Sequence, residues 1–167
     1  APVVWLVSGD VTINGIVSLN GQNTLPSPQL AEPGSGGFRG GAGYRAPGAG
    51  NSAGFGPGGG GLDSWIGVGG SYGTKIAAKG QPTYGNASLI PLIGGSGGAG
   101  TAGDGGWISG GGGAGAILIA CSGSLTVSGT IRADGGGNTA HNSGAGSGGG
   151  IRLVADTLGG IGMAQAL

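Results

Sequence analysis

The chain has 167 residues, of which 49 are glycine and only 7% are charged. Its six basic and six acidic residues cancel, so it lacks the high net charge of a disordered chain. The basic residues are scattered singly, unlike the basic clusters of a nucleic-acid-binding protein. No apolar run reaches the roughly 18 residues that a transmembrane helix requires. We therefore expect a folded chain that binds no nucleic acid and does not span a membrane.

The first predicted element is an apolar strand close to the N-terminus. The chain begins at Ala1-Pro2 without an initiator methionine, as an exported protein does after loss of its signal peptide, although a trimmed chain would begin in the same way. Trp5 is too large to be fully covered by the thin core that so glycine-rich a chain can build. We predict that this strand is donated to a neighbouring copy, which would bury it. The predicted assembly residues are Val3, Val4, Trp5, Leu6 and Val7.

An internal repeat follows. Residues 8–21 align without gaps on residues 122–135, 114 residues further along the chain. Apolar residues alternate in both copies, which predicts two short strands around a tight reversal at Asn14-Gly15 and at Ser128-Gly129. A fainter echo sets residues 113–120 beside residues 147–154. We predict a single domain (1–167) made of an N-terminal strand unit (1–21), a glycine-rich central region (22–115) and C-terminal strand units (116–167).

The glycine-rich region has a period of three. Small residues recur at every third position within residues 34–52, 58–73, 94–115 and 137–149. Three residues per turn is the period of the polyproline II helix, and collagen is excluded because its glycine register is unbroken and its proline content high. We predict polyglycine II-type helices, with a flexible linker as the alternative. The expected fold is all-β, with short strand repeats in a solenoid- or sandwich-like arrangement, glycine-rich helices of this type and essentially no α-helix.

The sequence contains no recognisable catalytic constellation. His141 is the only histidine and has no second ligand at metal-binding spacing. Cys121, the only cysteine, lies in an apolar run and is expected to be buried, with an intermolecular disulfide as the alternative. The six acidic residues are widely separated, so no pair of carboxylates is indicated. We expect no enzymatic activity, no cofactor and no metal.

Several segments resemble those of known glycine-rich proteins. Four segments resemble bacterial glycine-rich exported and surface proteins with short β-strand repeats and polyglycine II tracts: the units 11–15 and 125–135, the segment Gly36-Gly37-Phe38-Arg39-Gly40-Gly41 and the transition from glycine into the apolar run 116–120. The tracts of period three are also similar to the polyglycine helices of phage tail-tip adhesins and springtail antifreeze proteins. The resemblance implies that an ordered glycine lattice can be a folded state, and it leaves the activity open because those two groups act differently.

Three functions agree with these features. The first is a structural subunit of an extracellular, self-assembling filament or surface layer, because an assembled subunit needs little charged surface of its own. The second is a surface adhesin that displays aromatic side chains to glycans or a receptor. The third is ice binding, although no regular threonine array marks a flat face. The candidate surface contacts of the adhesin are Tyr44, Trp65, Tyr72 and Trp107, with Phe38, Phe55 and Tyr84 as further aromatics.

Overall fold

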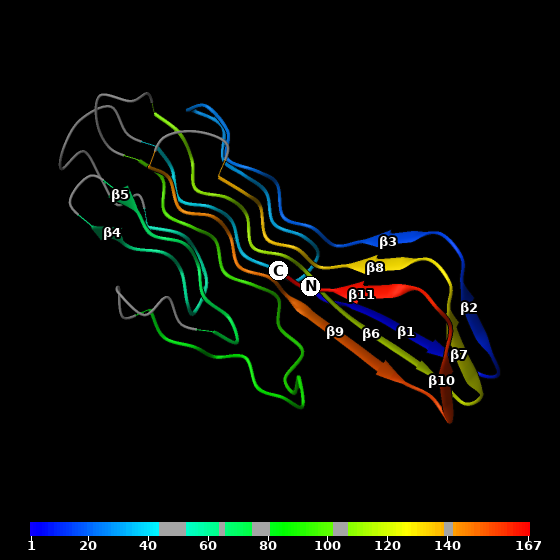
Figure 1. Cartoon of the computed structure of the whole chain (residues 1–167). Coiled ribbons are helices and arrows are strands. Elements are labelled where there is room, and N and C mark those ends of the chain that lie inside the picture. Colours follow the sequence, from blue (N-terminus) through cyan, green and yellow to red (C-terminus); the bar gives the residue numbers. More distant parts are fainter. Residues whose placement is uncertain (44–52, 64–65, 75–80, 102–106, 139–141) are drawn as a thin grey trace.

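The computed structural model describes residues 1–43, 53–63, 66–74, 81–101, 107–138 and 142–167. Every regular element in these ranges is a β-strand, which confirms the expected all-β class (Figure 1). The strands are β1 (Val3–Val7), β2 (Val11–Ile13), β3 (Ile16–Ser18), β4 (Leu62–Asp63), β5 (Ile66–Gly67), β6 (Ala116–Cys121), β7 (Ser124–Val127), β8 (Thr130–Arg132), β9 (Gly150–Val154), β10 (Thr157–Gly159) and β11 (Met163–Gln165).

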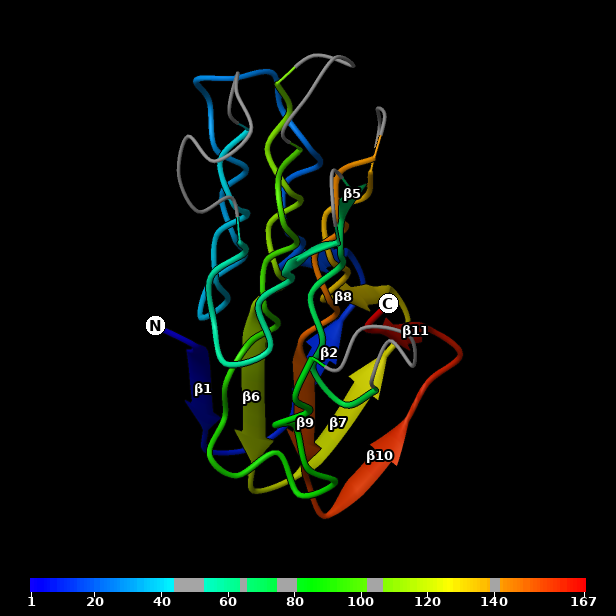
Figure 2. The same ribbon diagram turned by 90° about the vertical axis from the view of Figure 1, so that its left-hand side faces the viewer.

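Nine of these strands form three stacked layers. Layer 1 contains β1–β3, layer 2 contains β6–β8 and layer 3 contains β9–β11. Each layer gives one strand to each of three parallel sheets, whose orders are β1-β6-β9, β2-β7-β10 and β3-β8-β11. Layer 2 therefore lies between the other two, and Figure 2 shows β1, β6 and β9 side by side. The short strands β4 and β5 form a separate antiparallel pair.

The pairing register confirms both sequence alignments. Val11 pairs with Leu125, as the alignment over 114 residues requires, and Ile117 pairs with Ile151, as the fainter echo requires. The predicted tight reversals are wrong, because β2 and β3 belong to different sheets and do not pair with each other. Neither Gly15 nor Gly129 has a positive φ. The chain bends at these glycines into the next sheet, so the strands stack on those of other layers instead of forming hairpins.

The apolar core lies inside this stack and is centred on layer 2. Side chains at alternate positions of a strand share one face of the sheet, and those on the inner face of layer 2 are covered by layers on both sides. Cys121 is among them, as expected. The core side chains of layer 2 are Ile117, Ile119, Cys121, Leu125, Val127, Ile131 and Ala133, and those of layer 1 are Ile13 and Leu19.

Polar side chains of layer 1 tie the corners of the first two layers together. The carboxylate of Asp10 accepts a hydrogen bond from the backbone N–H of Ser124 at 2.7 Å, and Asn20 accepts one from the N–H of Asp134 at 3.0 Å. Donor and acceptor are 114 residues apart in both pairs. These side chains satisfy backbone groups exposed where the strands end.

The glycine-rich segments lie side by side at the other end of the molecule (Figures 1 and 2). The central segment is 109–116, which leads into β6. Its backbone N–H groups donate in turn to three different neighbours, so each neighbour is met at every third residue. Residues 109, 112 and 115 donate to Leu25, Gln22 and Leu19; residues 110, 113 and 116 donate to Gly41, Phe38 and Ser35; residues 111 and 114 donate to Gly144 and Ser147.

Glycine is required in the central segment because other backbones lie against it on several sides. A Cβ atom built on Gly110 would overlap the carbonyl oxygen of Gly98, and one on Gly112 would overlap that of Glu32. In segment 34–43 the restriction falls on every third residue, since Cβ atoms on Gly34, Gly37, Gly40 and Gly43 would each overlap backbone atoms of Leu19 or of residues 107–114. Ordered backbone hydrogen bonds thus replace side-chain packing in this part of the chain.

Candidate functional site

The most unusual surfaces of the strand stack are its two ends, the layer 1 end and the layer 3 end. Leu125 and Leu158 are neighbours in one ladder, yet Leu125 is 0% exposed and Leu158 is 62% exposed. The two positions differ in that Leu125 has a layer on each side, whereas no described strand lies beyond Leu158. Layer 2 is thus covered on both sides, whereas layers 1 and 3 are each covered on one side only.

The layer 1 end carries the predicted assembly strand. The structure places Val3–Val7 in β1, which pairs with β6 of the same chain along one edge and has no described strand on its other edge. Trp5 lies opposite Ile119 in the ladder, so its side chain is on the inner face of the sheet. Ile119 is fully buried, whereas Trp5 is 42% exposed. Val4 and Leu6 belong to the alternate set of β1 side chains and are exposed.

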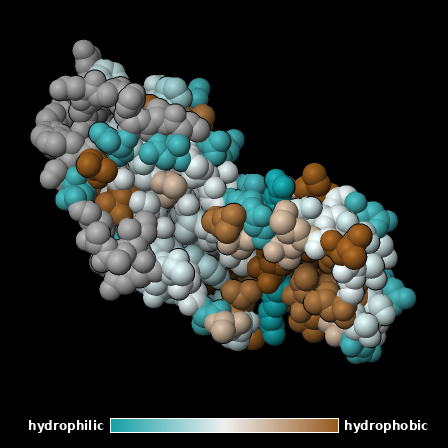
Figure 3. All heavy atoms as spheres, in the orientation of Figure 1, coloured by the Kyte–Doolittle hydropathy of each residue, from teal (hydrophilic) through white to brown (hydrophobic). Residues whose placement is uncertain are grey.

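The layer 3 end contains a hollow. Ala164 lies opposite Ile131, and Gly160 lies against the backbone of Val127. A hollow of about 390 Å³ opens there, lined by side chains from β9 and β11 and by Leu89. Figure 3 shows apolar residues gathered over the strand-bearing part of the molecule, while the glycine-rich part is close to neutral in hydropathy. The exposed apolar side chains of this end are Val154, Leu158, Ile161 and Met163.

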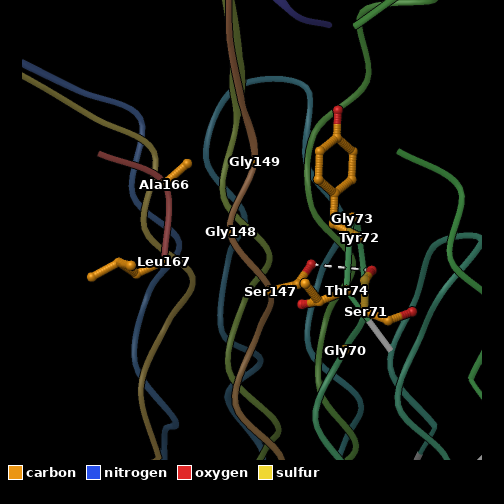
Figure 4. A pocket seen from close by; sticks show the side chains of 10 residues that line it. All are labelled: Gly70, Ser71, Tyr72, Gly73, Thr74, Ser147, Gly148, Gly149, Ala166 and Leu167. Atoms are coloured by element: carbon orange, nitrogen blue, oxygen red, sulfur yellow. Dashed lines mark hydrogen bonds between the residues drawn. The ribbon is translucent and has the colours of Figure 1, made fainter. Parts of the chain in front are cut away.

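A second hollow, of about 450 Å³, lies beside Tyr72. Figure 4 shows the Tyr72 ring on one side, Ala166 and Leu167 on the other, and the backbone of Gly148 and Gly149 between them. The Ser147 hydroxyl donates to the carbonyl of Ser71 at 3.2 Å. Burial raises the pKa of the Tyr72 hydroxyl, which is protonated at neutral pH in any case and can donate a hydrogen bond.

Tyr84 packs against Tyr72, and its hydroxyl makes hydrogen bonds inside the molecule. Their rings meet edge to face with centroids 5.1 Å apart, and the Tyr84 hydroxyl donates to the carbonyl of Gly94 at 2.7 Å. The hydroxyl of buried Ser96 donates to Tyr84 at 2.9 Å and accepts from the N–H of Gly58 at 3.0 Å. Burial raises the pKa of Tyr84 to about 12, although the hydrogen bond from Ser96 opposes this shift. Tyr84 is therefore a structural aromatic and not a displayed one.

Two of the four predicted surface contacts, Tyr72 and Trp107, lie among the described residues. Tyr44 and Trp65 lie outside the described residues, as does His141. Trp107 is partly exposed at the start of the central glycine segment, and Tyr72 lines the second hollow. The layer 3 end was not predicted from the sequence. Its signal was the continuation of the echo past Val154, which needs a one-residue gap before Thr157 to place Leu158 at the position of Leu125.

Among the described residues, no three His, Cys, Asp or Glu side chains gather where they could hold a metal ion. The described part of the chain also contains no helix long and apolar enough to cross a membrane. Comparison with known proteins gives no match to a family model, a curated protein or a solved structure.

Proposed function

We propose that this chain is a structural subunit that assembles with copies of itself into an extracellular filament or surface layer. The observation that carries the proposal is the open stack, in which layers 1 and 3 leave apolar side chains such as Trp5 and Leu158 exposed. Unpaired strand edges with apolar side chains are templates for further strands. A chain in which only 7% of residues are charged has few means of blocking such contacts.

Two features of the interior support a structural role. The three layers of parallel strands have the pairing expected of a short solenoid, in which each repeat contacts only its neighbours and the end repeats need a cap or a partner. The rotation of hydrogen-bond donors among three neighbours in segment 109–116 is what polyglycine II-type helices require. Such a lattice is rigid, because its backbone groups are paired in several directions. This combination also agrees with the resemblance to bacterial glycine-rich surface proteins.

Electron microscopy tests the proposal. Purified protein is concentrated at neutral pH and viewed in negative stain, with sedimentation velocity on the same samples. We expect regular filaments or sheets of uniform width and a sedimentation coefficient that rises with concentration. Dispersed particles of monomer mass at all concentrations would refute the proposal.

The hollow beside Tyr72 supports a second candidate, a glycan-binding module at a surface. It joins an aromatic ring to hydroxyl groups, which is the kind of surface that sugars contact. Binding of glycans by a monomeric sample, lost in Tyr72→Ala and kept in Trp107→Ala, would favour this candidate. No binding by the monomer would exclude it.

A further inference from the structure

We propose that successive copies stack head to tail, so that layer 3 of one copy pairs with layer 1 of the next in the register used inside the chain. This inference rests on the proposed function and specifies its contact. The partner is a second copy because the chain already makes this contact twice. Strand β9 pairs with β6, and β6 pairs with β1. Both pairs are parallel, and each residue of β6 from Ile117 to Ala120 lies opposite one residue on either side.

The register of the contact follows from the ladders. Val4 lies opposite Leu118, and Leu118 lies opposite Arg152. If the ladder continues, Arg152 of one copy lies opposite Val4 of the next. The same extension places Leu158 beside Val11 and Met163 beside Ile16 in the other two sheets. All three sheets then continue without a break across the contact.

The two end surfaces complement each other in shape. Trp5 is the largest inner side chain of the layers and projects from layer 1. Its ladder continues through Ile119 to Leu153, which lines the hollow of layer 3. The lining also includes the small side chain of Ala164. A Trp5 side chain from the next copy would therefore enter the space that layer 3 leaves unfilled.

The contact has the apolar character of an internal one. Leu158 would acquire the two-sided cover that Leu125 already has. Burying a side chain of this size stabilises a contact by about 1.5–3 kcal/mol, and several such side chains lie on each end. Pairing also satisfies backbone groups along the open edges of three strands.

The geometry sets the dimensions of the resulting filament. Neighbouring strands lie about 4.8 Å apart, so three layers advance the assembly by about 14 Å per subunit. Each such step contains one chain of 15.3 kDa. Fibre diffraction or helical image analysis should therefore give meridional spacings near 4.8 Å and near 14 Å.

Disulfide trapping tests the register directly. The paired cysteines are Val4→Cys and Arg152→Cys, in a Cys121→Ala background that removes the native thiol. Within one chain these positions are two strand spacings apart, about 9–10 Å, which exceeds the roughly 7 Å limit for a disulfide. Across the proposed contact they are adjacent. Oxidation should give a ladder of covalent oligomers.

Two control sets separate this contact from others. In the pair Leu6→Cys with Arg152→Cys, one cysteine is displaced by two residues along the strand, so the Cα atoms of the two cysteines are about 7–8 Å apart across the contact. This pair should cross-link several-fold less. Val4→Cys alone should give no covalent dimer. Strong cross-linking of Val4→Cys alone would mean that two layer 1 ends meet, and would overturn the proposal.

A charge placed in the hollow gives an independent test. Ala164→Glu should abolish filament growth and leave the melting temperature of the monomer unchanged, because Ala164 is exposed in the single chain. Gln29→Glu, at an exposed position in the glycine-rich part of the molecule, is the control and should assemble normally. If the wild type forms no assemblies, the proposed function itself fails. If it forms assemblies that tolerate Ala164→Glu and do not cross-link in register, the function stands and this contact is wrong.

Discussion

Replacing Gly110 by alanine tests the close packing of the glycine segments. Gly110 is buried, and its φ lies outside the left-handed region, so alanine can adopt its backbone conformation. The added Cβ would overlap the carbonyl oxygen of Gly98 on the neighbouring segment 93–101. Because the overlap is with backbone, no side-chain rotation can relieve it. The two segments have to move apart.

The size of the effect follows from the bonds between these segments. They are joined by hydrogen bonds from Gly95 to Ala114 at 2.8 Å, from Gly98 to Gly111 at 2.9 Å and from Thr101 to Ile108 at 2.9 Å. Each contributes about 1 kcal/mol net, so their weakening costs up to about 3 kcal/mol. Overpacking in a tight interior costs a similar 1–3 kcal/mol. For a chain of this size, about 3 kcal/mol lowers the melting temperature by roughly 6–12 °C.

Thermal unfolding followed by circular dichroism or calorimetry measures this change in a monomeric sample. Gly15→Ala is the matched control, because a Cβ at Gly15 meets nothing within 4 Å and its φ is also outside the left-handed region. It should be neutral or slightly stabilising, by up to about 1 kcal/mol. If Gly110→Ala is no more destabilising than Gly15→Ala, the glycine segments are not packed backbone to backbone and the reasoning is refuted.

Three further variants test the stack and its support. Leu125→Ala should cost about 2–5 kcal/mol of unfolding free energy, whereas Leu158→Ala in the same ladder should change the monomer by no more than about 0.5 kcal/mol, as denaturant titration would measure. Asp10→Ala should cost about 1 kcal/mol by losing the acceptor for the Ser124 N–H, and Asp10→Asn, which keeps an acceptor, should cost less in the same assay. The Tyr84 pKa is raised from 10.0 to about 12, so its contribution to stability is present below pH 10 and is lost as the pH rises towards about 12; Tyr84→Phe should reduce this alkaline loss.

Each of these predictions has a result that contradicts it. Equal losses for the two leucine variants in the monomer would mean that the layer 3 end is covered in the single chain. Equal losses for the alanine and asparagine variants at Asp10 would show that its acceptor oxygen is not what joins the layers. The ionisation of Tyr84 is followed through tyrosinate absorbance. If all tyrosines ionise near pH 10, the burial of Tyr84 is contradicted.

Much of the strand arrangement could be predicted from repetition. The gapless alignment of residues 8–21 on 122–135 identifies Val11 and Leu125 as equivalent, and equivalent strands of a repeat stack on one another. The period of two identified the inner faces. The hairpin prediction failed because Asn-Gly and Ser-Gly suit both a reversal and a bend, and local sequence does not distinguish them. The choice depends on the strands available from distant parts of the chain.

The glycine period was informative where a segment lies at the side of the bundle. In 34–43 the glycines that lie against Leu19 and residues 107–115 are spaced three apart, so small residues are needed at every third position. In 109–116 every face meets a neighbour, so small residues at all positions obscure the period. The layer 3 hollow could not be predicted, because residues from distant parts of the chain line it, among them Leu89, Leu153 and Ala164.

The position of layer 2 has a consequence for how the chain reaches its native state. Layer 1 comes first in the sequence, yet its strands pair with partners 114 residues further along. No strand of layer 1 can find its native neighbour during synthesis until most of the chain has left the ribosome. Folding that depends on such distant pairing is slow, and the apolar β1 stays without its partner throughout. The time that this strand spends unpaired is the period in which pairing with the wrong copy competes with folding.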